Sequence, residues 1–331
     1  MEPPARVLLL TDARMEAHRS SGHPERPERL AAAVAGVEAG ARAAAAELLR
    51  GEPRAASDEL LTAIHDPLYL AALERAAKAG GGWLDADTYL VGESMVAVRL
   101  AAGATVDAAV AVARGEAAIA FAAVRPPGHH AARERGSGFC LFNNVAIAVA
   151  ALRTAGLARR IAIVDWDVHH GDGTQSIFAA DADLWYGSTH QSPLFPGTGA
   201  VGERGIGPAR GTKHNVPLPP GAGDEALLLA WRDELLPALW SFAPDAILVS
   251  AGYDATEADP LAALRVSDAG YRELGLALGE VVQRLQLPGI ALALEGGYDL
   301  VALASGVAAT LVGLLAGMRP AGGAHLYSGP R

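Results

Sequence analysis

Three aspartates and two histidines crowd into eight positions of the segment IAIVDWDVHHGDGTQ, residues 161–175, directly after an aliphatic run. Such groups are costly to bury unless they pair with one another or bind a ligand. Asp167 and His169 are two positions apart, so on an extended backbone their side chains point the same way. With a further carboxylate such as Asp254 they could hold a metal and leave positions open for water and substrate, as in catalytic zinc sites. An ordinary hydrogen-bonded pair is the alternative for Asp167 and His169 alone.

A second group is the tandem histidine pair His129 and His130 in RPPGHH. Two adjacent histidines need two partners, and Asp165 and Asp172 remain once Asp167 is assigned to a metal. The spacing does not decide which aspartate pairs with which histidine. A carboxylate that accepts an imidazole N–H fixes the tautomer and raises the basicity of the ring. Two such pairs beside a metal-bound water are suited to acid–base hydrolysis.

A third candidate is Tyr298 in LEGGYD. The two glycines before it allow a sharp turn of the backbone. Its phenol could polarise a carbonyl group and stabilise a tetrahedral oxyanion. A role in packing is the alternative for a tyrosine in this context.

Short aliphatic runs predict the strands that must position these residues, at 6–12, 118–127, 160–167, 183–190, 245–254 and 289–298. Helix-length amphipathic segments lie between most of them, at 28–50, 93–114, 143–156, 223–241 and 268–286. This alternation predicts an α/β fold with three layers, α/β/α, around a mainly parallel sheet. RPPGHH, DWDVHHGD, SAGYD and EGGYD each end or follow a predicted strand, so we expect them at one rim of the sheet, where ligands bind. Residues 195–223 are predicted to form an irregular surface loop.

The composition argues against a nucleic-acid-binding, disulfide-linked or membrane-spanning protein. The chain has 331 residues, 51% of them hydrophobic, a formal net charge of -10 and no run of Lys or Arg, so a nucleic-acid partner is not expected. A single cysteine, Cys140, excludes a disulfide within the chain and favours a cytoplasmic location. The first residues lack the features of a signal peptide, and we expect no uncharged apolar stretch of about 18 residues and hence no membrane span. Neither a repeat nor a linker divides the chain, which predicts a single domain over 1–331.

The motifs resemble those of a known family. RPPGHH, GFCLFNN, DWDVHHGDGTQ, PLFPGTG, SAGYDATEADPL and LEGGYDL stand in the order found in zinc-dependent histone deacetylases. The sequence resembles this family from about residue 5 to about residue 315, leaving a short tail at 316–331. SGHPERPERL resembles the class II type, which includes bacterial deacetylase-like amidohydrolases and acetylpolyamine amidohydrolases. The resemblance implies the arginase/deacetylase-like fold and a zinc-dependent amidohydrolase that removes acyl groups from lysine side chains or similar amines.

The resemblance also implies catalytic roles. His130, oriented by Asp172, would be the general base for the attacking water. His129, paired with Asp165, would remain mainly protonated or act electrostatically. Tyr298 would donate a hydrogen bond to the acetyl oxygen.

Two metal ions are implied in the same way. Zinc would be bound by Asp167, His169 and Asp254, although iron(II) could replace it because ligand type selects weakly between these ions. A structural potassium ion near the zinc would be bound through carbonyls or carboxylates of Asp165, Asp167 and His169, with Ser188 and Thr189.

The resemblance further assigns the walls of the site. Phe139 and Phe195 would form the aromatic walls of a narrow channel for the acyl-lysine chain, with Gly138 as the adjacent backbone contact. Arg29 and Cys140 would line an internal cavity below the metal, suited to acetate.

The substrate is less narrowly defined by the sequence. Leu261 stands seven positions after Asp254, where polyamine-selective relatives have a glutamate that attracts a second cationic amine. A leucine there favours an acylated lysine of a peptide or protein over an acylated small amine. Glu93 could supply a cation contact instead, although a solvated acid in the first turn of a helix is the simpler interpretation. A homo-oligomer is compatible with the sequence.

Two other classes of function stay open. An arginase-like hydrolase would need ligands for a second metal, and Asp259 is the only nearby candidate. A catalytically inactive module that binds acyl-lysine would be favoured by loss of Tyr298 or of a histidine, and all of these are present. Metal stoichiometry separates a one-zinc deacetylase from a two-manganese arginase. The entrance to the site is expected between loops 14–27 and 195–223.

Overall fold

The computed structural model describes residues 4–319, which are built around an eight-stranded sheet in the order β2-β1-β5-β10-β9-β6-β7-β8. Every neighbouring pair in this sheet is parallel. The central strands are buried along their whole length, as expected for a parallel sheet that helices cover on both faces. In sheet order the strands are Glu47–Gly51, Arg6–Leu10, Ile119–Ala122, Ile290–Leu294, Ala246–Ala251, Ile161–Asp165, Leu184–Gln191 and Lys213–Leu218.

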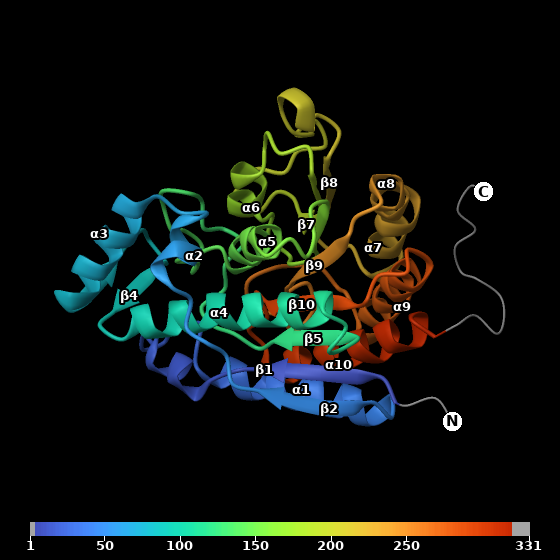
Figure 1. Cartoon of the computed structure of the whole chain (residues 1–331), viewed down its shortest axis with the longest axis horizontal. Helices are drawn as coiled ribbons and strands as arrows, with labels where there is room; N and C mark the ends of the chain where they lie inside the picture. The colour runs from blue at the N-terminus through green and yellow to red at the C-terminus, as the bar shows by residue number, and fades with distance from the viewer. Residues whose placement is uncertain (1–3, 320–331) are drawn as a thin grey trace.

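Helices cover both faces of the sheet. The helices α1 (Glu28–Ala43), α9 (Asp268–Arg284) and α10 (Leu300–Gly317) pack together, as do α4 (Ser94–Ala113) and α5 (Asn144–Thr154). The two groups lie on opposite faces, and α4 crosses in front of β5 and β10 in Figure 1. Right-handed crossovers explain this division, because α1 and α9 connect strands in one direction across the sheet and α4 and α5 connect strands in the other.

Shorter elements complete the structure around the sheet. A hairpin of β3 (Gly81–Trp83) and β4 (Tyr89–Val91) precedes α4. A π-helical turn, Trp231–Leu235, joins α7 to α8 within one nearly continuous helical segment. The bounds of the remaining elements are Ala13–Ala17 (η1), Asp58–Thr62 (α2), Pro67–Lys78 (α3), Asp172–Ile177 (α6), Gly207–Ala209 (η2), Asp224–Ala230 (α7) and Leu236–Phe242 (α8).

All six predicted strands are present, and the five predicted helices are present with two corrections. The helix expected over 28–50 ends at Ala43, and residues 47–51 form the edge strand β2 instead. Ala45 has a φ of 54°, a left-handed conformation that stops the helix and turns the chain toward β1. The second correction is minor: the segment expected over 223–241 contains the π-helical turn.

Two expectations about irregular segments are also corrected. The loop expected over 195–223 contains the strand β8, which pairs with β7 at the edge of the sheet. The tail expected from residue 316 begins later, because Ala316 and Gly317 belong to α10. Residues 320–331 of that tail lie outside the described part of the chain.

Among the described residues, α4 and α10 are long and apolar enough to cross a membrane by length and composition. The expectation that no uncharged apolar stretch of this length occurs is therefore wrong, since residues 300–317 carry no charged side chain. Buried residues make up 72% of the apolar window of α4 and 50% of that of α10, because α4 packs on the sheet and α10 on α1 and α9. The absence of a membrane span stays a prediction.

The sheet order brings the four chemistry-bearing segments together. RPPGHH follows β5, EGGYD follows β10, SAGYD ends β9 and DWDVHHGD ends β6. These strands are four successive neighbours in the sheet and all run in the same direction. Their carboxyl ends therefore meet at one rim, as the sequence predicts.

Candidate active site

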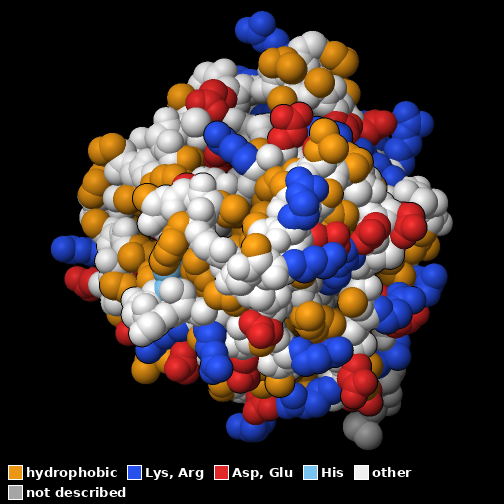
Figure 2. Space-filling model, turned by 90° about the vertical axis from the view of Figure 1, so that its left-hand side faces the viewer, with side chains coloured by type: hydrophobic (Ala, Val, Ile, Leu, Met, Phe, Trp, Pro, Cys, Tyr) orange, Lys and Arg blue, Asp and Glu red, His pale blue; other side chains and the backbone are white. Residues whose placement is uncertain are grey.

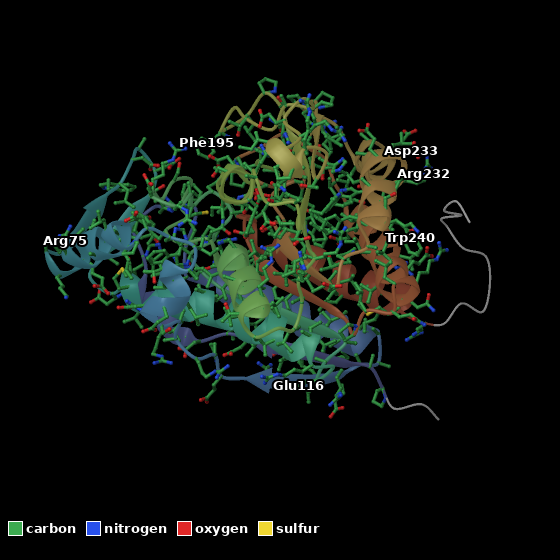
Figure 3. All side chains as sticks on the ribbon, turned by 45° about the horizontal axis from the view of Figure 1, so that its top comes forward. Arg75, Glu116, Phe195, Arg232, Asp233 and Trp240 are labelled. Atoms are coloured by element: carbon green, nitrogen blue, oxygen red, sulfur yellow. The ribbon has the colours of Figure 1, made fainter. Side chains whose placement is uncertain are left out.

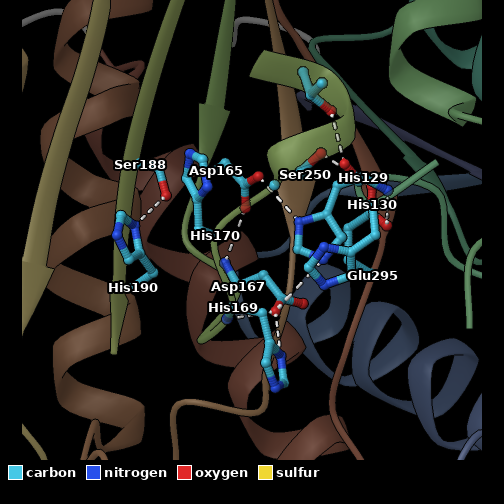
Figure 4. A network of polar contacts seen from close by, with 12 residues as sticks. His129, His130, Asp165, Asp167, His169, His170, Ser188, His190, Ser250 and Glu295 are labelled. Atoms are coloured by element: carbon cyan, nitrogen blue, oxygen red, sulfur yellow. Dashed lines mark hydrogen bonds and ion pairs between the residues drawn. The ribbon is translucent and has the colours of Figure 1, made fainter. Parts of the chain in front are cut away.

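Three ligand atoms converge at this rim. Single donor atoms of Asp167, His169 and Asp254 all lie within 4.8 Å of one another. Nδ1 of His169 is 3.1 Å from Oδ1 of Asp167 and 3.3 Å from Oδ2 of Asp254 (Figure 4 labels the first two residues). Asp254 Oδ2 is buried and has no hydrogen bond. Two buried carboxylates thus face each other across one imidazole, which is an arrangement that calls for a cation.

The pKa shifts of these groups also indicate a site for a cation. Burial raises the pKa of Asp254 to about 7, and the charge of Asp167 adds to the shift. Burial alone would lower the pKa of His169, but its contacts with Asp167 and Asp254 raise it to about 10. Carboxylate oxygens and an imidazole nitrogen are ligands that zinc and iron(II) accept. The residues therefore fit a divalent metal ion with three protein ligands.

Backbone groups hold the carboxylates in place. The N–H of Gly296 donates to Oδ2 of Asp167 at 2.7 Å, and the N–H of Val168 donates to Oδ1 of Asp254 at 2.9 Å. A Cβ at Gly296 would collide with the carboxylates of Asp254 and Asp167, so the glycine after β10 is needed for this close approach. Such contacts orient ligands and are part of a metal site as much as the ligands are.

Two histidine–aspartate pairs lie beside this cluster, and Figure 4 labels His129, His130 and Asp165 of these pairs. Nδ1 of His129 is 3.1 Å from Oδ2 of Asp165, and Nδ1 of His130 is 2.8 Å from Oδ1 of Asp172. The spacing alone left this pairing open, and the structure has the pairing that the resemblance implied. The two rings are 4.0 Å apart between centroids.

The two rings have different environments. Burial lowers the pKa of His130 to about 3, and the charge on His129 adds to this. Burial would also lower the pKa of His129, but the carboxylates of Asp167 and Asp165 raise it well above its usual value. Burial therefore favours the neutral form of His130, which can accept a proton, whereas the neighbouring carboxylates favour the protonated form of His129. Paired groups whose environments separate their pKa values in this way are typical of acid–base sites.

A cavity of about 180 Å³ opens above these groups. On the face shown in Figure 2, a histidine is visible in a recess between hydrophobic side chains. Phe195 lies near the edge of the molecule, on the side away from Arg232 (Figure 3). The cavity is lined by Asp87, Pro127, His129, His130, Gly138, Phe139, His169, Leu194, Phe195, Leu261, Gly296 and Tyr298. All four residues expected in the channel are thus brought together with both histidines and the tyrosine.

Tyr298 is buried, with 7% of its surface exposed, and its ring stands perpendicular to Phe139 at 5.7 Å between centroids. The guanidinium carbon of Arg29 lies 4.8 Å from the centroid of the Tyr298 ring. Burial raises the pKa of Tyr298 well above its usual value, although Arg29 opposes this shift. The phenol therefore stays protonated and can act as a hydrogen-bond donor inside the cavity.

Comparison with known proteins identifies the family of this chain. Residues 23–314 match the family described as the histone deacetylase domain. This chain belongs to the histone deacetylase family. It is 36% identical over 282 residues to the histone deacetylase-like amidohydrolase of Pseudomonas aeruginosa, which covers 85% of this chain and 73% of that protein. It is 39% identical over 292 residues to a probable deacetylase of Archaeoglobus fulgidus, which covers 88% of this chain and 81% of that protein.

The fold is confirmed by a solved structure. The crystal structure of the HDA15 HD domain matches with a TM-score of 0.86 and 35% sequence identity, over 94% of this chain and 88% of that chain. The predicted α/β architecture of the arginase/deacetylase type is therefore that of this protein.

Within this histone deacetylase fold, the two residues expected at an internal cavity, Arg29 and Cys140, are both buried. Nε of Arg29 donates to the carbonyl of Gly297 at 2.7 Å, and Nη1 lies 3.2 Å from the carboxylate of Glu25. Cys140 is fully buried, with its thiol 3.3 Å from the carbonyl of Gly138. A cavity between them that takes acetate stays a prediction.

The potassium site also stays a prediction, although its residues are close in the structure. Asp165 at the end of β6 is opposite Ser188 on β7, and both are buried. The hydroxyl of Thr189 accepts a hydrogen bond from the indole of Trp231 at 3.1 Å. Ser188 Oγ is 2.9 Å from Nδ1 of His190.

Sequence analysis missed Glu295. Its Oε2 accepts the backbone N–H groups of Gly128 at 2.6 Å and His129 at 3.1 Å, and its Oε1 accepts from the hydroxyl of Ser250 at 3.0 Å. This buried carboxylate fastens the tandem-histidine loop to the end of β10 (Figure 4). The sequence does contain an indication of this role, because Glu295 directly follows a fully apolar strand and a buried carboxylate requires hydrogen-bond partners.

The acidic residue that lines the cavity was likewise not identified from the sequence. Glu93 is exposed at the N-cap of α4 and does not line the cavity, as its simpler interpretation implied. Asp87, in the loop of the β3–β4 hairpin, lines the cavity instead. The segment LDADT carries two acids, and its spacing gave no sign of which would face the pocket.

Substituting Gly138 with alanine is expected to lower kcat/KM by about 10- to 100-fold, because a displacement of a reacting group by about 1 Å can cost up to about 100-fold. Gly138 has a φ of 53°, and a Cβ there would lie 2.5 Å from Cδ2 of His130 and 2.8 Å from Phe195. Gly202→Ala is the control, since a Cβ at Gly202 meets no atom within 4 Å. Equal activity of the two variants would contradict the placement of His130 against this glycine.

Proposed function

We propose that this protein is a zinc-dependent amidohydrolase that removes acetyl or other acyl groups from acylated lysine side chains of peptides or proteins. The observation that carries the proposal is the convergence of Asp167, His169 and Asp254, the second of which lines a cavity together with His130 and Tyr298. Membership of the histone deacetylase family supports the reaction class. A divalent ion at the three ligands would supply a Lewis acid for the acyl carbonyl and lower the pKa of water.

The chain's own residues would then move the protons. His130 donates Nδ1–H to Asp172, which leaves its Nε2 free to take a proton from the attacking water. The protonated phenol of Tyr298 would donate a hydrogen bond to the acyl oxygen as negative charge develops there. Both groups are buried, so these interactions act with little competition from solvent.

Departure of the amine requires a proton donor. His130 carries the proton taken from water, and it can deliver this proton to the leaving nitrogen. The positive charge on His129, held by Asp165, would favour the negatively charged intermediate electrostatically. The cleavage gives a carboxylic acid and a free amine, so no redox partner is required.

The pocket favours an extended apolar chain over a second cation. Leu261 lines the cavity at the position discussed above, together with Leu194 and two phenylalanine rings. Such walls suit the methylene chain of an acylated lysine. The second candidate is an acetylpolyamine, which Asp87 at the cavity favours because its carboxylate could pair with a second amine. An arginase-like site is disfavoured, since the carboxylate of Asp259 already accepts the N–H groups of Leu261 and Tyr298.

We further propose that the reaction takes place in the cytoplasm, on soluble substrates. The single cysteine is buried and forms no disulfide, which is in keeping with a reducing compartment. Fractionation of expressing cells tests this proposal.

The substrate proposal is tested by comparing kcat/KM for acetyl-lysine peptides with that for N-acetylated putrescine, cadaverine and spermidine. We expect the peptides to be preferred, and Leu261→Glu to shift the ratio by about tenfold toward acetylpolyamines, because a charge at the mouth attracts the second amine. Leu261→Gln is the matched control of the same size without the charge. Preference of the unmodified protein for acetylpolyamines would overturn the assignment and direct attention to Asp87.

A further inference from the structure

The inner wall of the channel has a strained backbone. Gly138 and Phe139 have φ values of 53° and 69°, so two successive residues adopt the left-handed conformation. For a phenylalanine this conformation is disfavoured and persists only where surrounding contacts impose it. The backbone N–H of Phe139 donates to the buried hydroxyl of Thr88 at 3.0 Å, which ties the wall to the loop between β3 and β4. The position of this wall therefore depends on what fixes the loop between β3 and β4.

His23, in the N-terminal loop, lies where these segments meet. The backbone N–H of Glu25 is 3.0 Å from its Nδ1, and its Nε2 is 3.0 Å from the carbonyl oxygen of Asp87. The Nδ1 atom of His23 also lies 3.3 Å from the carbonyl oxygen of Glu25, so this side of the ring faces the backbone of Glu25 and the other side faces that of Asp87. The His23 ring also stands edge-on to Phe139 at 4.6 Å and to Tyr89 at 4.8 Å between centroids.

We propose that His23 is a positioning residue, which fixes the strained wall of the channel by joining residues 23–25, residues 84–89 and Phe139. The proposal rests on the deacylase function proposed above. His23 governs capture of the acyl-amine and not the chemical step. The catalytic histidines and the metal ligands are held by hydrogen bonds of their own, whereas Asp87 and Phe139 line the part of the cavity that receives the substrate chain.

Two variants separate the contacts of His23, and a variant at a different histidine is the control. His23→Phe keeps a ring against Phe139 but loses both hydrogen bonds. His23→Gln keeps a side-chain N–H that can reach the carbonyl of Asp87. His214→Phe is the matched control, because His214 is also half-buried and hydrogen-bonded to a backbone carbonyl, at 2.8 Å from Gly211, but lies on the edge strand β8.

We expect His23→Phe to raise KM for an acetyl-lysine peptide by about tenfold with kcat within about twofold of the unmodified protein, since hydrogen bonds of ordinary strength are lost outside the reacting groups. His23→Gln should restore most of the KM, and His214→Phe should change neither constant. An unchanged KM in His23→Phe overturns the proposal. So does an equal loss in kcat, or the same loss in the His214→Phe control.

A second readout does not depend on turnover. Hydrogen exchange of the backbone amides at 84–91 and 137–140 should be faster in His23→Phe than in the unmodified protein or in His214→Phe, because the loop loses its link to the N-terminal segment. Faster exchange in these two segments supports the positioning role even if the protein hydrolyses no acyl-amine. Absence of hydrolysis would count against the proposed function and not against the positioning role. Unchanged exchange overturns the positioning role whatever the activity.

Discussion

Replacing Tyr298 with phenylalanine is expected to lower kcat for deacetylation by about 10²- to 10³-fold, the usual cost of removing one donor that stabilises an oxyanion. The phenol is a protonated donor in the cavity that His169 also lines. KM should change little, because the ring and its packing against Phe139 are retained. Steady-state kinetics on an acetyl-lysine peptide measure the effect.

The variant should fold and keep its metal. The backbone N–H of Tyr298 is held by Asp259 at 2.7 Å, and the guanidinium of Arg29 lies against the ring, so neither contact depends on the hydroxyl. Metal content and the thermal unfolding midpoint of Tyr298→Phe serve as controls. Wild-type kcat in a metal-loaded, folded variant would show that the phenol does not stabilise the intermediate.

Substituting His130 with asparagine is expected to lower kcat by about 10²- to 10⁴-fold, the range for loss of a general base. The structure favours His130 over His129 for this role, because burial holds its pKa at about 3 and keeps it neutral, whereas His129 is held protonated. Rapid quenching of acetate release under saturating substrate measures the chemical step directly.

His129→Asn is the matched comparison, since both residues are buried and each is hydrogen-bonded to one aspartate. We expect a smaller loss of kcat in this variant, because an electrostatic contribution is removed but the base remains. If His129→Asn loses more activity than His130→Asn with metal content unchanged in both, the assignment of the two histidines is reversed.

Much of the fold follows from local sequence. Continuous aliphatic runs identify buried parallel strands, and the helices between them identify the crossovers, so the three-layer architecture and the shared rim of four motifs are predictable. The two edge strands, β2 and β8, are not predictable in this way. ELLRG at 47–51 continues an alanine-rich helical pattern, and only the left-handed Ala45 and pairing with β1 make it a strand. The strand β8 is difficult to predict from the sequence because KHNVPL lies at the edge of the sheet and contains polar residues, unlike the aliphatic central strands.

The reacting groups were also more predictable than their supports. Asp167, His169 and the tandem histidines are recognisable because their types and spacing are unusual at strand ends. Glu295, Asp87 and His23 act through contacts with segments far away in the chain, at separations that local pattern does not encode. The role of Glu295 follows from the order of the strands, which places β5 beside β10. The roles of Asp87 and His23 follow from the contact between the N-terminal loop and the β3–β4 hairpin.

We propose that one divalent ion at Asp167, His169 and Asp254 makes this protein an amidohydrolase. The most direct test strips the protein with a chelator, adds zinc in steps and follows acetate release from an acetyl-lysine peptide together with bound metal. We predict no turnover in the stripped protein, a linear rise that ends at one zinc per chain, and no rise in Asp254→Asn. A rise that ends only at two metals per chain, or turnover that survives removal of the metal, would contradict the account.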